Sequence, residues 1–326
     1  MKVVITGSIA YDYIMSFPGY FKEHILPDRI ERLSLSFLVD SMRKQRGGCA
    51  TNIAYNLALL GERPKVMATA GEDFAEYRAW LEAHGVDTSA IVEIPGEFTA
   101  SFFVSTDRAN NQIASFYTGA MAYAHTLSFR ENNLGPVDLV VISPNDPRAM
   151  ERYVEECREL GLPYLYDPSQ QIVRLSPEAL RAGIEGARIL AVNDYEFELI
   201  REKTGLSEED VLACTQVLVI TRGEQGSTII TREGRLEIPP VPPTTVVDPT
   251  GVGDAYRAGL IKGMAMNLPW EIAGRMGSVA ATYVLEQAGT QNHRYTLEEF
   301  VARFRQHFDD GGALDALLTP PERHNP

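Results

Sequence analysis

The feature that most constrains the fold is an alternation of short apolar runs with helical patterns along most of the chain. The runs are rich in β-branched residues, which predicts strands buried on both faces. Strand, helix and strand in this order imply parallel pairing with right-handed crossovers. The sequence therefore predicts an α/β fold with a mainly parallel central sheet. The predicted strands are Val3–Thr6, Lys65–Thr69, Asp138–Ser143, Tyr164–Asp167, Ile189–Asn193 and Val217–Thr221, followed by a hairpin of Ser227–Thr231 and Arg235–Ile238. The predicted helices are Asn52–Leu60, Tyr77–His84, Pro147–Leu160, Pro177–Glu185, Asp194–Thr204, Gly253–Met266 and Pro269–Ala288.

Composition and charge narrow the class of protein. The 326 residues are 44% apolar, which is ordinary for a globular protein, and carry a net charge of −14. This charge opposes binding to nucleic acid or to an anionic membrane. The three cysteines are far apart and form no Cys-x-x-Cys pair, which argues for reduced thiols and against a zinc site. No apolar run reaches membrane-spanning length and no signal core precedes the first strand, so we expect a cytoplasmic protein.

Two stretches, 15–46 and 97–117, interrupt the alternation and lack helical periodicity. They contain strand-like pieces at Arg32–Val39, Thr99–Thr106 and Gln112–Tyr117. We expect them to form a small discontinuous β lid over the carboxyl ends of the central strands, where ligands bind in open α/β sheets. The remaining segments, 1–14, 47–96 and 118–326, would form one large domain. The alternative is a surface excursion without a role.

A glycine-rich segment, Asp248-Pro-Thr-Gly-Val-Gly-Asp254, runs directly into a predicted helix. Gly251 and Gly253 let backbone N–H groups converge at the positive end of that helix, which predicts an anion hole for a transferring phosphoryl group. Asp254 stands beside the hole, where a carboxylate can take the proton of an attacking hydroxyl. The alternative is a tight turn with Asp254 as a helix cap. A Walker-A loop is excluded because the chain contains no Gly-Lys pair.

Three further motifs occur in a fixed order with this segment. They are Gly47-Gly48 followed by Asn52, Asn193-Asp-Tyr-Glu196, and Thr221-Arg-Gly223-Glu-Gln-Gly226. With the segment at 248–259, they make the chain resemble the ribokinase-like (PfkB) family of carbohydrate and nucleoside kinases over nearly its whole length. The resemblance implies a three-layer ribokinase-like fold with a small β-sheet lid. It also implies ATP and Mg²⁺ as cofactors and, commonly, activation by K⁺.

The resemblance also implies roles for individual residues around the acceptor. Asp254 would be the catalytic base, beside the Gly251 and Gly253 anion hole. Asp12, Gly48 and Asn52 would hold a sugar diol, since a carboxylate and an amide match a pair of hydroxyls. The alternatives are a turn aspartate at the end of the first strand for Asp12 and a helix cap for Asn52.

On the nucleotide side, the resemblance implies that Asn193 and Glu196 orient Mg²⁺ and the phosphates, with Glu196 acting through water. The pair also matches an ordinary capping box, and the two roles are compatible. Thr221, Gly223 and Gly226 would approach ATP. Arg174 is the nearest predicted cation for the γ-phosphate, with a surface arginine as the alternative. Asp248 and the loop 287–290 are candidates for holding K⁺.

Five stretches, 7–12, 17–19, 33–40, 112–121 and 167–174, narrow the acceptor. They resemble the corresponding stretches of the mycobacterial-type adenosine kinases within this family. In those relatives, phenylalanines that match Phe102 and Phe116 bracket the purine, the second from a partner subunit. Other nucleoside-pocket positions match Ser8, Ser36, Gln170 and Gln171. A purine has two π-faces that favour aromatic neighbours, which agrees with the lid composition. The lid also contains Phe103 and Tyr117. The alternative is that these aromatic residues form the core of the lid or of a dimer contact, which explains Phe103 and Tyr117 at least as well as ligand stacking does.

The resemblance predicts phosphorylation of the 5′-hydroxyl of adenosine by ATP, giving AMP and ADP, in a homodimer formed through the lid. The nearest alternatives are a broader nucleoside kinase and a ribose or fructose kinase. A binding or regulatory protein on an inactive kinase scaffold is a further alternative, which the intact 248–254 segment opposes. A dinucleotide-dependent oxidoreductase is disfavoured, because Gly7-Ser-Ile-Ala follows the first strand in place of Gly-x-Gly-x-x-Gly.

Overall fold

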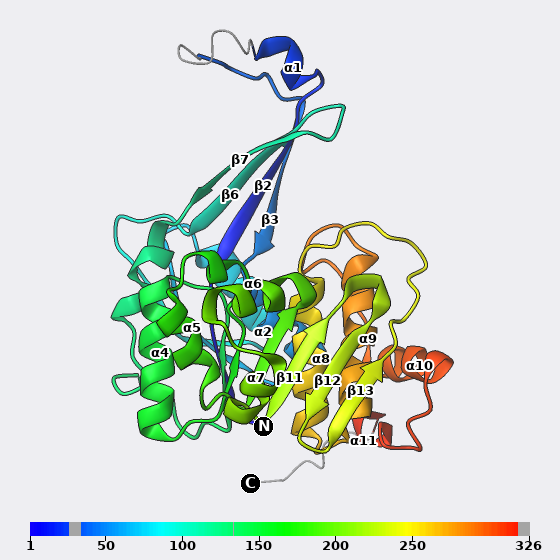
Figure 1. Cartoon of the computed structure of the whole chain (residues 1–326). Helices are drawn as coiled ribbons and strands as arrows, with labels where there is room; N and C mark the ends of the chain where they lie inside the picture. Colours follow the sequence, from blue (N-terminus) through cyan, green and yellow to red (C-terminus); the bar gives the residue numbers. More distant parts are fainter. Residues whose placement is uncertain (26–33, 133, 319–326) are drawn as a thin grey trace.

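The computed structural model describes residues 1–25, 34–132 and 134–318 (Figure 1). Its centre is a nine-stranded sheet in the order β13-β12-β11-β10-β9-β8-β1-β4-β5. The strands from β11 to β5 are parallel, and β12 and β13 add an antiparallel hairpin at one edge. The predicted α/β class and the predicted hairpin are confirmed. The strands are β1 Val3–Thr6, β4 Lys65–Ala70, β5 Asp87–Glu93, β8 Leu139–Ile142, β9 Tyr164–Tyr166, β10 Ile189–Asn193, β11 Val217–Thr221, β12 Ser227–Thr231 and β13 Gly234–Ile238.

Helices cover both faces of this sheet and enclose two apolar cores. Successive strand residues point to opposite faces, so Val3 and Ile5 join one core and Val4 joins the other. The first core is closed by α2 Cys49–Leu59, α3 Ala75–Ala83, α8 Val252–Ala265 and α9 Trp270–Leu285. The second is closed by α4 Pro147–Leu160, α5 Pro177–Ile184, α6 Asp194–Thr204 and α7 Glu208–Cys214. Two more helices, α10 Leu297–His307 and α11 Asp315–Leu318, pack outside α9.

None of the helices in the described ranges is long and apolar enough to cross a bilayer. The longest, α9, has 16 residues and lies against the central sheet.

A second sheet of four strands projects from the α/β body as a lid (Figure 1). Its order is β3-β2-β6-β7, and a short helix, α1 Phe21–His24, lies at its tip. The strands are β2 Ala10–Ser16, β3 Ser41–Gly47, β6 Ala100–Thr106 and β7 Gln112–Tyr117. The sheet therefore begins at Ala10, before the lid segment that we predicted to start at residue 15.

The strand predicted at Arg32–Val39 is wrong in its described part. Residues 32 and 33 lie outside the described ranges, and residues 34–39 form no strand. Their alternating apolar side chains mimic a strand, but Phe37 instead packs edge-on against Phe17 and Phe21 at the lid tip. The actual strand, β3, is mostly exposed and polar, so its sequence carries no apolar alternation. Pairing with β2 along its whole length holds it in place.

Candidate functional site

The predicted motifs gather at the carboxyl ends of neighbouring parallel strands. Ser8 follows β1, Asp167 follows β9, and Asn193 and Thr221 end β10 and β11. Asn193 and Thr221 are register partners, so the two nucleotide motifs start side by side. Parallel strands present these ends at one edge of the sheet, which is where open α/β folds bind ligands.

The glycine-rich segment ends in helix α8 as predicted. Gly251 is the N-cap residue, with φ of +80°, and a Cβ there would lie 2.9 Å from the side chain of Thr290. A side chain at this position would therefore be both strained and obstructed. Asp254 lies in the first turn, is buried, and makes no capping hydrogen bond. The cap interpretation of Asp254 is wrong, and its carboxylate bonds elsewhere.

That partner is Asn52, whose Nδ2 donates to Oδ2 of Asp254 at 2.9 Å. The other end of the Asn52 amide accepts from Nε2 of Gln291 at 3.0 Å. Gln291 thereby fixes which end of the amide faces the carboxylate. Asn52 is buried in helix α2, whose N-cap is Gly48, so the helix-cap interpretation of Asn52 is also wrong.

The Gly47-Gly48 pair joins lid strand β3 to helix α2. Gly48 has φ of +97°, and a Cβ there would lie 2.5 Å from the carbonyl oxygen of Ser8 and 2.7 Å from the backbone nitrogen of Ala10. A Cβ on Gly47 would lie 2.5 Å from Oδ2 of Asp12. The pair therefore lets strand β2, which carries Asp12, pack closely against the start of helix α2, which carries Asn52.

Asp12 lies within strand β2, so it is not a turn aspartate. Within the described part of the chain, its carboxylate has no hydrogen-bond partner, and the residue is half-buried. Burial and the nearby charge of Asp248 raise the pKa of Asp12 to about 6. A half-buried carboxylate without a donor is able to accept further hydrogen bonds.

The lid strands place the two predicted purine-binding phenylalanines in one row with Asp12. Asp12 is the register partner of Phe102, and Phe102 is the register partner of Phe116. Register partners share one face of a sheet, so Asp12, Phe102 and Phe116 form a single row across the lid. Phe103 belongs to the next row and stacks on Tyr13 at 4.7 Å, which supports the lid-core alternative for Phe103 alone.

The cation bound into the site is Arg257, a residue that we had not predicted. Its Nη2 donates to Oδ1 of Asp167 at 2.7 Å, and its Nε lies 2.6 Å from Oδ2. Both side chains are buried. Burial alone would lower the pKa of Arg257, but the charges of Asp167, Asp254 and Glu196 outweigh it and raise that pKa above its ordinary value. The guanidinium therefore stays charged.

The same surroundings set the pKa of Asp254. Burial raises that pKa to about 6, although the charge of Arg257 and the hydrogen bond from Asn52 both oppose the increase. The charge of Glu196 adds to the increase. A carboxylate with such a pKa is ionised at neutral pH and still basic enough to accept a proton.

On the nucleotide side, Asn193 and Glu196 form the predicted capping box. Oδ1 of Asn193 accepts from the backbone nitrogen of Glu196 at 2.7 Å, and Oε2 of Glu196 accepts from the backbone nitrogen of Asn193 at 2.8 Å. Gly223 has open space where a side chain would be, whereas a Cβ on Gly226 would meet the carbonyl oxygen of Ile238. Gly223 thus leaves room for a ligand, and Gly226 is required by packing.

A magnesium ion suits the charges at this edge of the sheet. Asp167, Glu196 and Asp254 interact electrostatically around the single guanidinium of Arg257, which leaves an excess of negative charge. No group of three or more acidic, histidine or cysteine side chains within the described residues is arranged to bind a metal directly. Mg²⁺ keeps most of its water and needs few protein ligands. Contact between Glu196 and a hydrated magnesium ion stays a prediction.

Asp248, the predicted K⁺ residue, ties two loops together. Its Oδ1 accepts from the backbone nitrogen of Thr250 at 2.9 Å, and its Oδ2 accepts from that of Gly289 at 3.1 Å. The carboxylate therefore lies where the 248–251 and 287–290 loops meet.

The remaining predicted site residues differ in their burial and in their contacts. Ser8 accepts from the backbone nitrogen of Cys49 and holds the start of α2. Gln171 is buried, and its Oε1 has no hydrogen-bond partner among the described residues, whereas Gln170 is exposed. Arg174 is exposed, and no contact within the described ranges brings it to Asp254. Ser36 belongs to the exposed segment at the lid tip, away from the body (Figure 1).

Three residues that complete the site were missed because their partners are remote in sequence. Arg257 is 90 residues from Asp167, and Gln291 is 239 residues from Asn52. Lys203, on α6, donates to the carbonyl oxygens of Ile172 and Leu175 and holds the turn that follows Gln171. The only available signal was the position of Arg257, three residues after Asp254 and thus on the same helix face.

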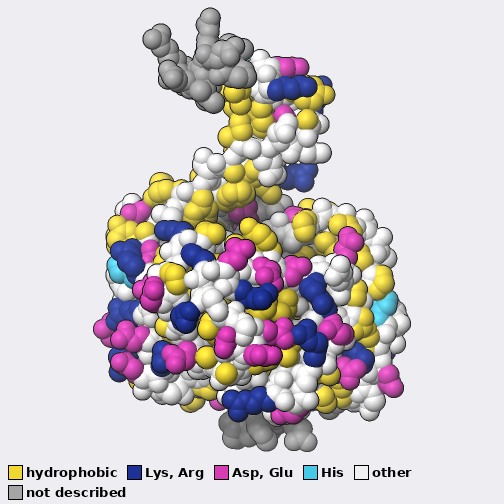
Figure 2. Space-filling view, viewed as in Figure 1, with side chains coloured by type: hydrophobic (Ala, Val, Ile, Leu, Met, Phe, Trp, Pro, Cys, Tyr) yellow, Lys and Arg dark blue, Asp and Glu magenta, His cyan; other side chains and the backbone are white. Residues whose placement is uncertain are grey.

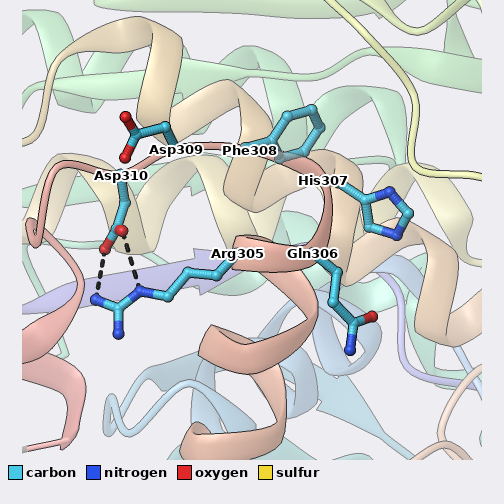
Figure 3. A pocket seen from close by; sticks show the side chains of 6 residues that line it. All are labelled: Arg305, Gln306, His307, Phe308, Asp309 and Asp310. Carbon is cyan, nitrogen blue, oxygen red and sulfur yellow. Dashed lines mark hydrogen bonds and ion pairs between the residues drawn. The ribbon is translucent and has the colours of Figure 1, made fainter.

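A separate depression at the end of α10 is lined only by residues 305–310 (Figure 3). Its charged groups are engaged with each other, since Arg305 donates to both carboxylate oxygens of Asp310 at 3.0 and 2.9 Å. None of the glycine-rich motifs contributes to it. The depression is therefore not a candidate for the functional site.

Comparison with known proteins agrees with this geometry. Residues 2–296 match the pfkB family of carbohydrate kinases. The chain is 40% identical to the nucleoside kinase of Burkholderia thailandensis, which has been solved in complex with inosine. The match covers 94% of this chain and 98% of that kinase, with a TM-score of 0.83. Another structure of that kinase is a complex with ADP-inosine.

Two archaeal proteins are also similar over most of their length. The nucleoside kinase of Methanothermobacter thermautotrophicus is 31% identical over 93% of this chain and 95% of its own. The nucleoside kinase of Methanocaldococcus jannaschii, described as an archaeal member of the ribokinase family, is 29% identical in its structure. That structure covers 94% of this chain and 99% of its own, with a TM-score of 0.85. The predicted ribokinase-like fold is thereby confirmed.

Proposed function

Because this chain belongs to the pfkB family of carbohydrate kinases, we propose that it transfers the γ-phosphoryl group of ATP to the 5′-hydroxyl of a nucleoside. The observation that carries the proposal is the placement of two carboxylates on the elements that flank the Gly47-Gly48 link. Asp254 is buried against Asn52 on helix α2, and Asp12 lies without a donor on the adjoining lid strand. One carboxylate is placed to accept a proton and the other to accept hydroxyl groups.

In the proposed reaction, Asp12 and Gly48 hold the ribose diol. Asn52 contributes the N–H of its side-chain amide that does not bond to Asp254. Asp254 takes the proton of the 5′-hydroxyl as its oxygen bonds to the γ-phosphorus. The bond between the γ-phosphorus and the bridging oxygen breaks, and ADP leaves with that electron pair. Backbone N–H groups at Gly251–Gly253 and the start of α8 stabilise the charge on the transferring group. Mg²⁺ bound with ATP would supply positive charge to the phosphates.

The acceptor that we propose is adenosine, with Phe102 against the purine and Gln170 and Gln171 near its edge. Support comes from the buried Oε1 of Gln171, which lacks a donor within the described residues and would be satisfied by an N–H group of the base. A broader purine nucleoside kinase is the second candidate. It is favoured by the 40% identical kinase bound to inosine, and by the ability of glutamine amides to present either a donor or an acceptor.

A coupled assay of ADP release tests the proposal. The panel is adenosine, inosine, cytidine, ribose and fructose, each with ATP and Mg²⁺. We expect the highest kcat/KM with adenosine, and comparable values for adenosine and inosine would instead support the broader candidate. Turnover of ribose or fructose alone would refute nucleoside phosphorylation.

We propose K⁺ as an activator held by the loops that Asp248 joins. The same assay, run in potassium and in sodium salts at equal ionic strength, tests this role. We expect faster turnover in potassium, and equal rates in both salts would refute it.

A second copy of the chain is the proposed partner of the lid. Several lid side chains are apolar and exposed, including Leu38 at 86%, Met42 at 61% and Phe116 at 51% (Figure 2). Apolar surface of this kind is favourable to bury in an interface. In a dimer through the lid, Phe116 and Ser36 would reach the nucleoside of the partner subunit.

Mixing two inactive or weakened variants distinguishes action in the partner subunit from action within one chain. Asp254→Asn lacks the base but keeps Phe116, whereas Phe116→Ala keeps the base. If Phe116 acts on the partner's site, mixed dimers contain one intact site, and we expect activity above that of Phe116→Ala alone. If mixing restores nothing in a sample shown by sedimentation to be dimeric, Phe116 does not act in the partner's site.

The pH dependence of the reaction follows from the raised pKa values of Asp254 and Asp12, both about 6. Asp254 must be deprotonated to act as a base, so kcat/KM is expected to rise with pH and to level off above about pH 7. If Asp12 must also be ionised, log(kcat/KM) will fall with a slope approaching two on the acid side. A pH profile measured with adenosine at subsaturating concentration checks this, and a flat profile between pH 5 and 8 would contradict it.

A further inference from the structure

The buried ion pair of Asp167 and Arg257 lies between the two halves of the proposed site. Asp167 follows strand β9 and begins the turn that carries Ser169, Gln170 and Gln171. Arg257 belongs to helix α8, three residues after Asp254. One hydrogen bond of 2.7 Å and one ion-pair contact of 2.6 Å join the two side chains, and both are buried. It therefore fixes the catalytic helix relative to the turn with the glutamines.

Arg257 also lies directly under the anion-hole loop. A Cβ on Gly253 would approach its Nη1 to 2.6 Å, so the guanidinium occupies the space that a side chain at 253 would need. Asp254 adjoins Gly253 and faces the same side of α8 as Arg257. The other groups around Asp254 are Asn52 from α2, the thiol of Cys49, and the carboxyl groups of Asp167 and Glu196. Arg257 is the positive charge among these neighbours.

We propose that Arg257 is a positioning residue of the phosphoryl transfer: held by Asp167, its guanidinium supports the Gly251–Gly253 loop and keeps the carboxylate of Asp254 ionised. This inference rests on the proposed role of Asp254 as the base. Without the guanidinium, Asp254 would share a buried region with Asp167 and Glu196 and would retain its proton to higher pH. Without Asp167, no second carboxylate would neutralise the guanidinium, so its charge would lower the pKa of Asp254 further.

Substitutions of Arg257 and of Asp167 are expected to shift the pH dependence of kcat/KM in opposite directions. In Arg257→Gln we expect the acid limb, meaning the rise of kcat/KM with pH, to move to higher pH by about one unit. At pH values on this limb, kcat/KM would therefore be about tenfold lower. In Asp167→Asn, which breaks the same ion pair, we expect the limb to move down. Arg257→Lys keeps the charge and is expected to restore the limb to within a few tenths of a pH unit of the unchanged protein. If both neutral variants shift the limb in the same direction, or neither shifts it, the proposal is wrong and the pair only supports the fold.

A measurement that needs no turnover keeps this inference separate from the proposed function. The carboxyl group of Asp254 can be titrated by ¹³C NMR in the ligand-free protein, with Asp254→Asn to assign its signal. We expect the same opposite shifts in Arg257→Gln and Asp167→Asn. A protein that phosphorylates no nucleoside but shows these shifts would refute the proposed function alone, and one that phosphorylates adenosine without them would refute the role of Arg257 alone.

Discussion

Asp254→Asn is expected to lower kcat for adenosine phosphorylation by about 10³-fold while leaving adenosine binding largely unchanged. The substitution keeps the size of the side chain and an oxygen that can accept from Asn52, so the packing at the start of α8 is retained. It removes the carboxylate that lies beside the proposed anion hole and accepts a hydrogen bond from Asn52 on helix α2. Steady-state rates and calorimetric binding of adenosine would measure the two effects separately.

The same variant is expected to be at least as stable as the unchanged protein. The pKa of Asp254 is raised on folding to about 6, so the folded state favours the protonated form, and stability from this group is lost as pH rises through 6. At pH 7 an uncharged amide avoids this loss, which amounts to at most about 3 kcal/mol.

Asp210→Asn, at an exposed first-turn position of α7, is the matched control and should retain full activity. Retention of near-normal kcat in Asp254→Asn would refute the base assignment.

Gly48→Ala is expected to destabilise the protein by about 3 kcal/mol or more, because strain and collision add. The residue has φ of +97°, and the new methyl group would lie 2.5 Å from the backbone oxygen of Ser8. Since that atom belongs to the main chain, no side-chain rotation relieves the contact. The displacement would also move α2 and with it Asn52, so kcat should fall in whatever fraction remains folded. Urea denaturation and activity at 20 °C or below would measure both effects.

Gly85→Ala separates the two contributions. Gly85 has a similar φ of +88°, but a Cβ there meets no atom within 4 Å. The control therefore carries only the backbone strain, about 1 kcal/mol, and leaves the site untouched. Equal losses of stability in the two variants would contradict the collision at Gly48.

The central sheet was predictable because its strands are apolar on both faces. Runs such as Ile189–Asn193 and Val217–Thr221 match β10 and β11 residue for residue. The edge strand β5, Asp87–Glu93, escaped prediction because its outer positions are exposed and its sequence mixes polar and apolar residues. Helices α7 and α10 escaped as well. Helix α7 is too short, at seven residues, to show a clear period, and α10 packs outside the α/β layers that the alternation described.

The candidate site divides along a similar line. Glycine and capping motifs are local, so Gly251, Gly48 and the Asn193–Glu196 box could be read from neighbouring residues. The partners of Asp254 and Asp167 could not, since each meets its partner only after the chain has folded. The same limit led to the cap interpretations of Asp254 and Asn52: each residue stands in a first helical turn, and only the fold reveals that the two side chains bond to each other across 202 residues.

If Asp12, Phe102 and Phe116 bind the acceptor as proposed, the chain length of one short turn helps to determine which acceptor is used. Residues 107–111 connect β6 to β7, and Asp107 accepts hydrogen bonds from the backbone nitrogens of Ala109 and Asn111 within that turn. Adding or removing one residue there would slide β7 by one position and carry Phe116 to the opposite face of the lid. Such a change would leave the hydrogen bonding of the sheet intact. Insertions and deletions in this turn are therefore a route by which relatives of the protein could exchange one acceptor for another without altering a single residue of the phosphoryl-transfer site.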